Sequence, residues 1–455
     1  MYIQQIYTAC LAEASYYIES NGEAIVIDPI RDTDPYIVLA NERNAKITYI
    51  FETHFHADFV SGHIELSRLT EAKIIFGPNA RTLYSIISAT DGQIFQVGDL
   101  QIKALHTPGH TPESTCYLLL SNEGREEAIF TGDTLFIGEV GRPDLAVSKD
   151  ISKEELASSL YDSLHNVLLK LPDHVKVYPA HGAGSACGKN ISSETESTIG
   201  LQKQYNYALQ QMTKNEFIKT VLDGMSNPPK YFSHDVSLNQ NGYDSASNII
   251  INSLNFLSIS EIEKERIKGA TILDVRMPQD FENFFIPNSI NIGKTGMFAP
   301  WVGTLIHPVK PIVIICYVGE EKEVISRLTR IGYHNVIGYA HLETDTLQSE
   351  KLDRIVSIYS NDITINNSRL TKFLDVRRID EFERGHVSNA IHIPLDDLQI
   401  RLKELNQNTH YLIYCAGGYR SMIAASLCKL EGYNNIKNIY GGFNSIIQSN
   451  SVSIV

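Results

Sequence analysis

The sequence predicts an α/β protein with about three domains. The chain has 455 residues, enough for several domains of ordinary size. In its first half, short apolar runs with strand character each lead into a histidine or an aspartate. In its second half, a unit of strand, loop and helix occurs twice, at a spacing of about a hundred residues. These patterns predict one large N-terminal domain followed by two smaller α/β domains.

Composition narrows the classes of function. The net charge is −14, and the acidic residues do not cluster. Such a surface argues against nucleic acid or an anionic membrane as a partner, since both require a basic face. The first residues have neither the basic region nor the long apolar region expected of a signal peptide, and no later run approaches the roughly 18 apolar residues of a spanning helix. Six irregularly spaced cysteines do not indicate a disulfide framework. We therefore expect a cytoplasmic protein with reduced thiols.

The stretch from Thr53 to His63, THFHADFVSGH, carries much of the chemistry of the first half. It follows the apolar run 47–51, which has the β-branched and aromatic content of a buried strand. His54, His56 and Asp58 alternate with other residues, a spacing that lets their side chains converge on one cation. A solvated loop with scattered histidines is the alternative. Three similar segments argue against it: TPGHT at 107–111, TGD at 131–133 and PAHG at 179–182.

Strand and helix signals connect these segments. We predict strands over residues 24–28, 47–51, 73–76, 102–106, 116–120 and 128–130, and helices over 34–44 and 62–71. Proline and asparagine clusters between about residues 227 and 242 mark a change in composition. The first domain is therefore assigned to residues 1–240, with its boundary between about 230 and 255.

The second half repeats itself. Leu-Asp-Val-Arg occurs at 273–276 and again at 374–377, and Gly-Tyr occurs at 332 and at 432. In each copy a predicted strand and then a helix lie between these markers, which indicates a small domain with a parallel sheet. The predicted elements are 311–316 and 322–330 in the first copy, and 411–415 and 421–430 in the second. The domains are assigned to residues 256–345 and 352–450.

The second copy resembles the rhodanese family of sulfurtransferases. The resemblance rests on DEFERGHVSNAIHIP at 380–394 and CAGGYRS at 415–421. The loop after Cys415 can turn its backbone N–H groups toward the sulfur, and the helix that follows adds its positive end, so a thiolate or persulfide would be stabilised. We expect Cys415 to be the catalytic nucleophile and Arg420 to add a fixed positive charge. An inert buried cysteine is the alternative.

The first copy departs from this pattern. Its loop reads CYVGEE at 316–321, with glutamates where the second copy has Tyr419 and Arg420. Negative charge beside a thiolate raises its pKa and repels anionic sulfur donors. The span from Cys316 to Gly332 is also one residue shorter than its counterpart, so the sequence does not establish that the two cysteines are equivalent. We expect the first copy to be catalytically silent.

The N-terminal motifs, in their order, resemble the metallo-β-lactamase superfamily, whose fold is an αββα sandwich. TPGHTPES at 107–114, GRPDL at 141–145 and HGAG at 181–184 are similar to persulfide dioxygenases of that superfamily. This resemblance implies one Fe(2+) per chain, held by His54, His110 and Asp133. Two histidines and one carboxylate leave open positions on the ion. The implied reaction oxidises R–S–SH with O2 and water to R–SH and sulfite.

Neighbouring polar residues receive supporting roles. His56, Asp58 and His181 are expected to orient the ligands or to polarise bound substrate and water. Arg142 either binds an anionic group of the substrate through its planar fork or pairs with Asp144. Cys187 either handles sulfur near the pocket mouth or is a small apolar loop residue. Sequence alone leaves both alternatives open.

The residue at position 59 distinguishes a one-metal dioxygenase from a two-metal hydrolase. In two-metal hydrolases of the superfamily, including the glyoxalase II type, the loop reads His-x-His-x-Asp-His, and Phe59 occupies the position of the last histidine. A phenyl ring has no lone pair to donate, so a stable metal pair is not expected. A zinc-dependent thioester hydrolase of the glyoxalase II type is the main alternative. A sulfur-relay or sensing protein with a structural metal is another.

These observations predict a fused enzyme of persulfide metabolism. The first domain would oxidise low-molecular-weight thiol persulfides, such as those of glutathione or coenzyme A, to sulfite. Cys415 would carry a sulfane sulfur that sulfite can accept to give thiosulfate, so the fusion would keep an intermediate near its next use. The expected partners are these small molecules, O2 and further copies of the same chain. The sequence does not identify the physiological thiol.

Overall fold

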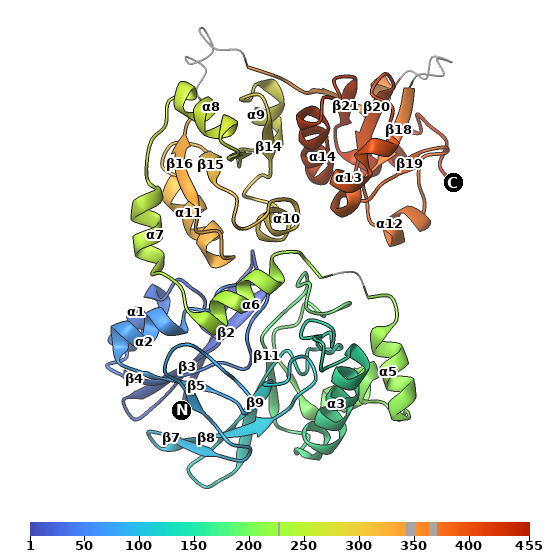
Figure 1. The fold of residues 1–455 in the computed structure, drawn as a ribbon. Coiled ribbons are helices and arrows are strands. Elements are labelled where there is room, and N and C mark those ends of the chain that lie inside the picture. Colours follow the sequence, from blue (N-terminus) through green and yellow to red (C-terminus); the bar gives the residue numbers. More distant parts are fainter. Residues whose placement is uncertain (226–227, 343–351, 364–370) are drawn as a thin grey trace. The chain divides into compact units, whose positions relative to one another are not determined.

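The chain forms two compact units in the computed structural model, which describes residues 1–225, 228–342, 352–363 and 371–455 (Figure 1). The first unit comprises Met1–Ile249 with Leu328–Gly332. The second comprises Ile250–Arg327 with Tyr333–Val455 and contains both copies of the repeat. The predicted end of the middle domain, at residue 345, lies outside the described residues.

The first unit is built on two six-stranded mixed sheets. Their strand orders are β1-β2-β3-β4-β5-β6 and β12-β11-β10-β9-β8-β7. The first sheet contains β1 (Tyr2–Thr8), β2 (Glu13–Ser20), β3 (Glu23–Ile27), β4 (Lys46–Phe51), β5 (Lys73–Phe76) and β6 (Ile87–Ser88). The second contains β7 (Ile94–Val97), β8 (Leu100–His106), β9 (Thr115–Leu120), β10 (Glu126–Gly132), β11 (Lys176–Pro179) and β12 (Ser197–Thr198).

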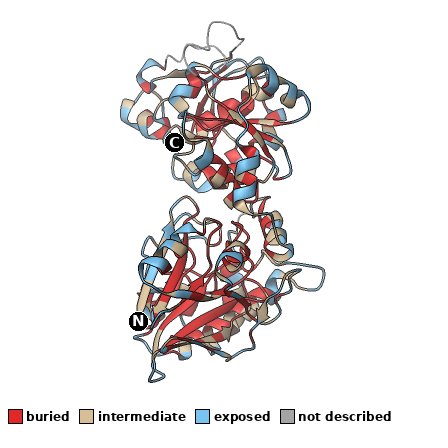
Figure 2. Ribbon diagram, turned by 90° about the vertical axis from the view of Figure 1, so that its left-hand side faces the viewer, coloured by how far each residue is buried: buried red, intermediate tan, exposed pale blue. Residues whose placement is uncertain are grey.

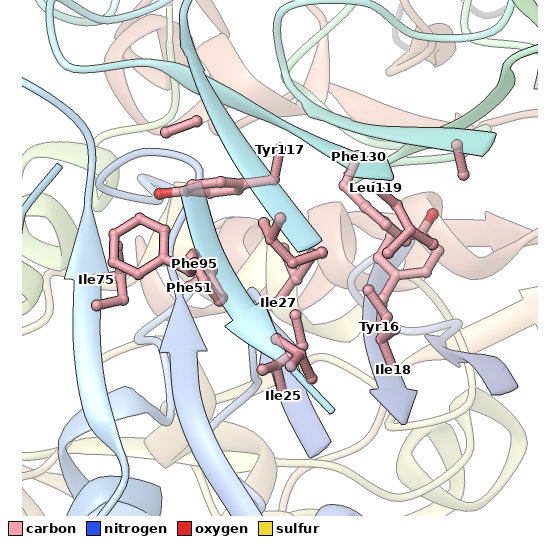
Figure 3. Close-up of a cluster of buried hydrophobic side chains, with 14 of the residues drawn as sticks. Tyr16, Ile18, Ile25, Ile27, Phe51, Ile75, Phe95, Tyr117, Leu119 and Phe130 are labelled. Atoms are coloured by element: carbon pink, nitrogen blue, oxygen red, sulfur yellow. The ribbon is translucent and has the colours of Figure 1, made fainter. Parts of the chain in front are cut away.

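One apolar core lies between these sheets (Figure 3). Alternate residues of each strand point to the same face, so β2 and β3 direct an apolar row toward the rows of β8 and β9. Aromatic rings join the two sheets. The ring centroids of Phe51 and Tyr117 are 4.7 Å apart, and those of Tyr16 and Phe130 are 4.9 Å apart.

Helices cover the outer faces of the sandwich. Leu160 and Leu164 of α3 and Phe217 of α5 pack in one cluster with the outward side chains of β9, β10 and β11. α3 and α5 each begin with a complete capping box, Ser152 with Glu155 and Thr213 with Glu216. The helices are α1 (Asp34–Glu42), α2 (His63–Thr70), α3 (Lys153–Asn166), α4 (Ile199–Tyr205), α5 (Lys214–Leu222), α6 (Phe232–Asn241) and α7 (Ala246–Ser253), with 3-10 turns at Leu168–Lys170 and Tyr207–Leu209.

The second unit contains two parallel sheets, as the alternation of strand and helix predicts. Their orders are β14-β13-β15-β16 and β17-β21-β20-β18-β19. The first copy comprises α8 (Ile259–Ile267), β13 (Thr271–Asp274), α9 (Pro278–Asn283), β14 (Ser289–Asn291), α10 (Phe298–Leu305), β15 (Ile312–Ile315), α11 (Glu321–Arg330) and β16 (Val336–Ala340).

The second copy follows the same plan with an added edge strand. It comprises β17 (Val356–Ile358), β18 (Thr371–Asp375), α12 (Ile379–Glu383), β19 (Ile391–His392), α13 (Leu395–Arg401), β20 (His410–Tyr414), α14 (Tyr419–Leu430), β21 (Ile436–Ile439) and α15 (Gly442–Ser449), with 3-10 turns at Ser360–Asp362 and Leu402–Glu404. Figure 2 shows the sheets of both units largely buried, with exposed residues on the outer helices and loops.

Strand register resolves the question of the two cysteines. Asp274 pairs with Ile315, and Asp375 pairs with Tyr414. Cys316 and Cys415 each follow directly, so they occupy equivalent positions. The span from Cys316 to Gly332 is therefore shorter than its counterpart because one residue is absent after the cysteine. No helix within the described ranges is long and apolar enough to cross a membrane.

Candidate functional site

The predicted metal ligands come from loops at the ends of three strands. His54 follows β4, His110 lies in the loop after β8, and Asp133 follows β10. Gly132, at φ +53°, lets β10 approach the histidine loop closely, because a Cβ there would lie 2.5 Å from the Thr53 hydroxyl oxygen. Residues separated by as many as 79 positions are thereby brought to one point.

The structure brings these three side chains together. A ring nitrogen of His54, one of His110 and a carboxylate oxygen of Asp133 all lie within 4.8 Å of one another. Oδ2 of Asp133 is 3.7 Å from Nε2 of His54 and 3.5 Å from Nε2 of His110. All three residues are buried.

Hydrogen bonds fix which atom of each ligand carries a free lone pair. The Thr53 hydroxyl donates its proton to Asp28 Oδ2 (2.8 Å), so it accepts from Nδ1–H of His54 at 2.9 Å. Nδ1–H of His110 donates to the backbone carbonyl of Arg142 at 2.8 Å. Nε2 of each imidazole is therefore left unprotonated, as a metal ligand requires.

The atoms that face this point fit a metal ion. Nε2 of His54 and Oδ2 of Asp133 are buried without a hydrogen-bond partner, an arrangement that costs free energy unless a cation binds them. Burial lowers the pKa of both His54 and His110, which keeps their rings neutral. Burial by itself raises the pKa of Asp133, but the charged His181 ring, which is bonded to its Oδ1, lowers it well below its usual value. The donor set is thus two neutral imidazoles and one carboxylate.

His181 fixes the other side of the Asp133 carboxylate. Its Nδ1–H donates to Asp133 Oδ1 at 2.7 Å, and its Nε2 lies 2.9 Å from Asp58 Oδ2. Burial opposes the charged ring, yet the two carboxylates raise the pKa of His181 well above its usual value. The ligating atoms of Asp58, His181 and Cys187 also lie within 4.8 Å of one another.

Cys187 is 1 % exposed, and burial raises the pKa of its thiol well above the usual value. Arg142 makes a bidentate ion pair with Asp144, at 2.6 and 2.8 Å, and donates to the carbonyl of Ala186. The backbone N–H of Arg142 also donates to the carbonyl of Cys187. These contacts join Arg142 and Cys187 in one loop structure. Their predicted contact with substrate remains a prediction.

His56 is turned toward a second group of carboxylates. Its Nε2 lies 3.1 Å from Asp28 Oδ1 and 3.6 Å from Glu52 Oε2. The Phe59 ring lies against it, with centroids 4.3 Å apart, and is fully buried. Phe59, at the motif position of the last histidine in a two-metal loop, thus packs against His56 and offers no ligand atom. Asp28 thus supports both His54 and His56. Its Oδ1 lies near His56, and its Oδ2 accepts from Thr53, whose hydroxyl is bonded to His54.

Sequence reasoning missed several residues of this centre. Asp28 was interpreted only as a strand end, and Glu52 and Glu113 were not singled out. Glu52 accepts from Ser61 and from His63, and Glu113 accepts from the N–H of Phe55 at 3.1 Å. Each is an acidic residue next to a strand end or a histidine motif, and that placement is the signal that could have identified them.

The second candidate site is the loop after β20. The N–H of Gly418 donates to Cys415 Sγ at 3.1 Å, and the Ser421 hydroxyl oxygen is 3.6 Å from the same sulfur. Gly418 has φ +107°, a left-handed conformation that turns its N–H inward. α14 begins at the next residue, so its positive end also faces the sulfur.

Arg420 and Tyr419 make specific contacts around this loop. Arg420 forms a bidentate ion pair with Glu381, at 2.6 and 2.7 Å, so its charge is partly balanced. The Tyr419 hydroxyl donates to the carbonyl of Gly293 in the first copy at 2.8 Å. A cavity of about 290 Å³ adjoins the loop and is lined by residues of both copies, among them Met277, Tyr419, Met422 and Tyr440.

Two family models match the chain. Residues 9–85 match the metallo-β-lactamase superfamily, and residues 258–340 and 362–449 match the rhodanese-like domain. A metallo-β-lactamase from Staphylococcus aureus, known from its crystal structure, is 30% identical, with a TM-score of 0.68; the match covers 75% of this chain and 99% of that one. The chain therefore belongs to the metallo-β-lactamase superfamily and carries two rhodanese-like domains in its second half.

Curated relatives of the first half are named as hydrolases. A probable hydroxyacylglutathione hydrolase of Schizosaccharomyces pombe is 35% identical over 187 residues, which are 40% of this chain and 67% of that protein. A cytoplasmic hydroxyacylglutathione hydrolase of Arabidopsis thaliana is 33% identical over 38% of this chain and 65% of that protein. The chain thus spans about two thirds of their length. ETHE1 of Myxococcus xanthus is 29% identical, with a TM-score of 0.46, over 53% of this chain and 98% of that one.

Proposed function

We propose that the first unit is an iron-dependent persulfide dioxygenase and that Cys415 of the second unit is a sulfurtransferase nucleophile. The observation that carries the first part is the convergence of three unprotonated ligand atoms, of His54, His110 and Asp133, on one point. Phe59 supports a single ion, since it fills the position of a further ligand. Iron(II) bound there would activate O2, and the terminal sulfur of a persulfide would give up the four electrons that O2 accepts as sulfite forms.

The chain's own residues would prepare the site for this reaction. Asp28, through Thr53, holds His54 in one tautomer, and the carbonyl of Arg142 does the same for His110. His181 binds one oxygen of Asp133 and so directs the other toward the ion. A cavity of about 270 Å³ beside His181, lined also by Tyr7 and Glu194, offers room for part of a thiol substrate. Contacts of substrate with Arg142 and Cys187 belong to the same proposal.

The second half would use the sulfite that the first half forms. A persulfide on Cys415 carries one sulfane sulfur, stabilised by the Gly418 N–H and the start of α14. Sulfite attacks that outer sulfur, the S–S bond to Cys415 breaks, and thiosulfate leaves with the cysteine as thiolate. Charge and atoms balance in this step. The proposed substrates are persulfides of small thiols such as glutathione or coenzyme A.

Anaerobic reconstitution with iron(II) tests the first activity. The reconstituted protein should consume O2 and form sulfite when glutathione persulfide or coenzyme A persulfide is added. His110→Ala should abolish both, whereas Cys415→Ser should keep O2 uptake and sulfite but form no thiosulfate. Absence of O2 uptake with several persulfides would overturn the proposal.

A zinc-dependent thioester hydrolase is the second candidate, favoured by the names of the curated relatives. It predicts hydrolysis of an acyl-glutathione without O2 and a tightly bound zinc pair. Metal analysis of the purified protein distinguishes the two. Phe59→His sharpens the test because it restores the motif of the two-metal hydrolases, and we expect it to increase the number of bound zinc ions.

A further inference from the structure

The first copy retains Cys316 but surrounds it with groups of a different kind. Cys316 follows β15, Glu321 begins α11, and His341 is the first residue after β16. The cysteine sulfur, a carboxylate oxygen of Glu321 and a ring nitrogen of His341 all lie within 4.8 Å of one another. The ends of two neighbouring parallel strands and the start of a helix thus bring a thiol, a carboxylate and an imidazole to one point.

The atoms of His341 and Glu321 that face each other form an ion pair but no hydrogen bond of good geometry. Nε2 of His341 and Oε2 of Glu321 are buried atoms without a hydrogen bond, although they are 3.4 Å apart. Buried polar atoms of this kind are rare unless water or an ion satisfies them. Cys316 is 1 % exposed. Glu320 beside them has a further unpartnered oxygen, Oε2, while its Oε1 binds Lys294 at 2.8 Å.

The spacing and the donor types indicate which cation would fit. Zinc binds nitrogen and oxygen ligands at about 2.0–2.1 Å in a tetrahedron, which places two such ligands about 3.3–3.4 Å apart. The separation of 3.4 Å between His341 and Glu321 agrees with this value. A thiolate and an imidazole favour zinc over magnesium or calcium, which prefer oxygen.

Two of the groups around Cys316 distinguish the first copy from the second. In the second copy, Arg420 stands where the first has Glu321, and Tyr440, the first residue after β21, corresponds to His341. Both ligands that join Cys316 are thus departures from the copy that has the sulfurtransferase loop.

We propose that Cys316, Glu321 and His341 bind one zinc ion, with the fourth position open to solvent or to Glu320. The ion ties the ends of β15 and β16 to the start of α11 and keeps the thiol of the first copy out of sulfur transfer. This site is separate from the centre at His54, His110 and Asp133. It does not depend on the activity proposed for either half.

Cobalt(II) added to the chelator-treated full-length protein tests the site, since a thiolate ligand gives an intense sulfur-to-cobalt band in the near ultraviolet. The ligands proposed for the other centre include no sulfur. The wild-type protein should show the band, and Cys316→Ser and His341→Ala should lose it. Cys428→Ser, which removes another buried thiol, should retain it, and so should Cys187→Ser, which excludes the cluster of Asp58, His181 and Cys187 as its source.

Zinc binding gives a second measurement. His341→Ala should hold one equivalent of zinc fewer than the wild-type protein at saturation, or bind that equivalent more than about tenfold more weakly. Loss of a residue that merely orients a ligand lowers metal affinity by about 10–100-fold, and loss of the ligand itself should lower it at least as much. His341 is partly exposed, so this variant keeps the test valid if Cys316→Ser does not fold. A band that persists in Cys316→Ser, no band in the wild-type protein, or equal zinc in His341→Ala would each overturn the proposal.

Discussion

The two rhodanese-like copies share one frame but differ in the loop that contains Cys316 or Cys415. In each, a buried aspartate at the end of an interior strand holds the arginine two residues later. The pairs are Asp274 with Arg276 and Asp375 with Arg377, and the closest oxygen–nitrogen distance is 2.7 Å in both. Each arginine also donates to a backbone carbonyl eight residues further on, of Phe284 and of Gly385.

The loops after β15 and β20 differ in charge. Both contain a left-handed glycine three residues after the cysteine, Gly319 and Gly418. The second copy then adds an arginine, while the first adds two glutamates. The same backbone path thus carries a candidate persulfide site in one copy and a candidate metal site in the other. The surroundings of the two cysteines thus differ in side-chain charge and not in the frame that holds them.

Replacing each cysteine should give the largest difference between the copies. We expect Cys415→Ser to reduce sulfur transfer by about a thousandfold or more, because the attacking sulfur is lost. Cys316→Ser should retain the reaction. Transfer from a persulfide donor to sulfite, measured as thiosulfate, checks both. If Cys316→Ser abolished transfer while Cys415→Ser did not, the roles of the two copies would be reversed.

Removing the arginine of the buried ion pair should destabilise both copies to a similar extent. Arg276→Ala and Arg377→Ala each leave an uncompensated buried aspartate, at a cost of about 3–5 kcal/mol in the local free energy of unfolding. Hydrogen exchange of peptides from β13 and β15 or from β18 and β20 measures each effect in the full chain. A large effect in one copy and none in the other would contradict a shared frame.

The two left-handed glycines provide a matched pair of smaller changes. Gly319→Ala and Gly418→Ala should each cost about 1–2 kcal/mol, since an alanine is strained at positive φ. Only Gly418→Ala should also slow sulfur transfer, by about tenfold, because the N–H that contacts Cys415 is displaced. Equal transfer rates in the two variants would show that this N–H does not support the sulfur.

The smallest expected effect concerns pH. Burial alone raises the pKa of Glu381, but the bonds to Arg420 and to the N–H of Arg378 lower it to about 2. Because the folded pKa lies below the unfolded one, the pair stabilises the fold above about pH 4.5, and this stabilisation is lost as the pH falls toward 2. Solvent screening limits it to roughly 1 kcal/mol.

Glu381→Gln should remove this acid-sensitive contribution, as measured by unfolding between pH 5 and pH 2. The counterpart in the first copy is Asp280, which is bonded to the hydroxyl of Tyr317 and not to an arginine. Asp280→Asn is therefore the matched control. An unchanged acid dependence in Glu381→Gln would show that the pair with Arg420 does not stabilise the second copy.

The sequence predicted most of the secondary structure that surrounds the sites. Strands such as β4 and β20 are apolar, β-branched runs that end at a chemical motif, so their position could be read directly. Helices α3 and α5 were not predicted, although their capping boxes, Ser152 with Glu155 and Thr213 with Glu216, are visible in the sequence. The apolar residues Leu156, Leu160 and Leu164 of α3 also follow the helical period.

By itself, the sequence predicted the order of the domains and the metallo-β-lactamase-type and rhodanese-type motifs, with His54, His110, Asp133 and Cys415 as candidate site residues, because these follow from local patterns and fixed spacings. Only the tertiary structure decided which lone pair each ligand presents, that Asp28 supports both His54 and His56, and that Arg420 is paired with Glu381. It also brought His341 to Cys316. These features depend on contacts between segments far apart in the chain, and the distances between such segments are set by packing.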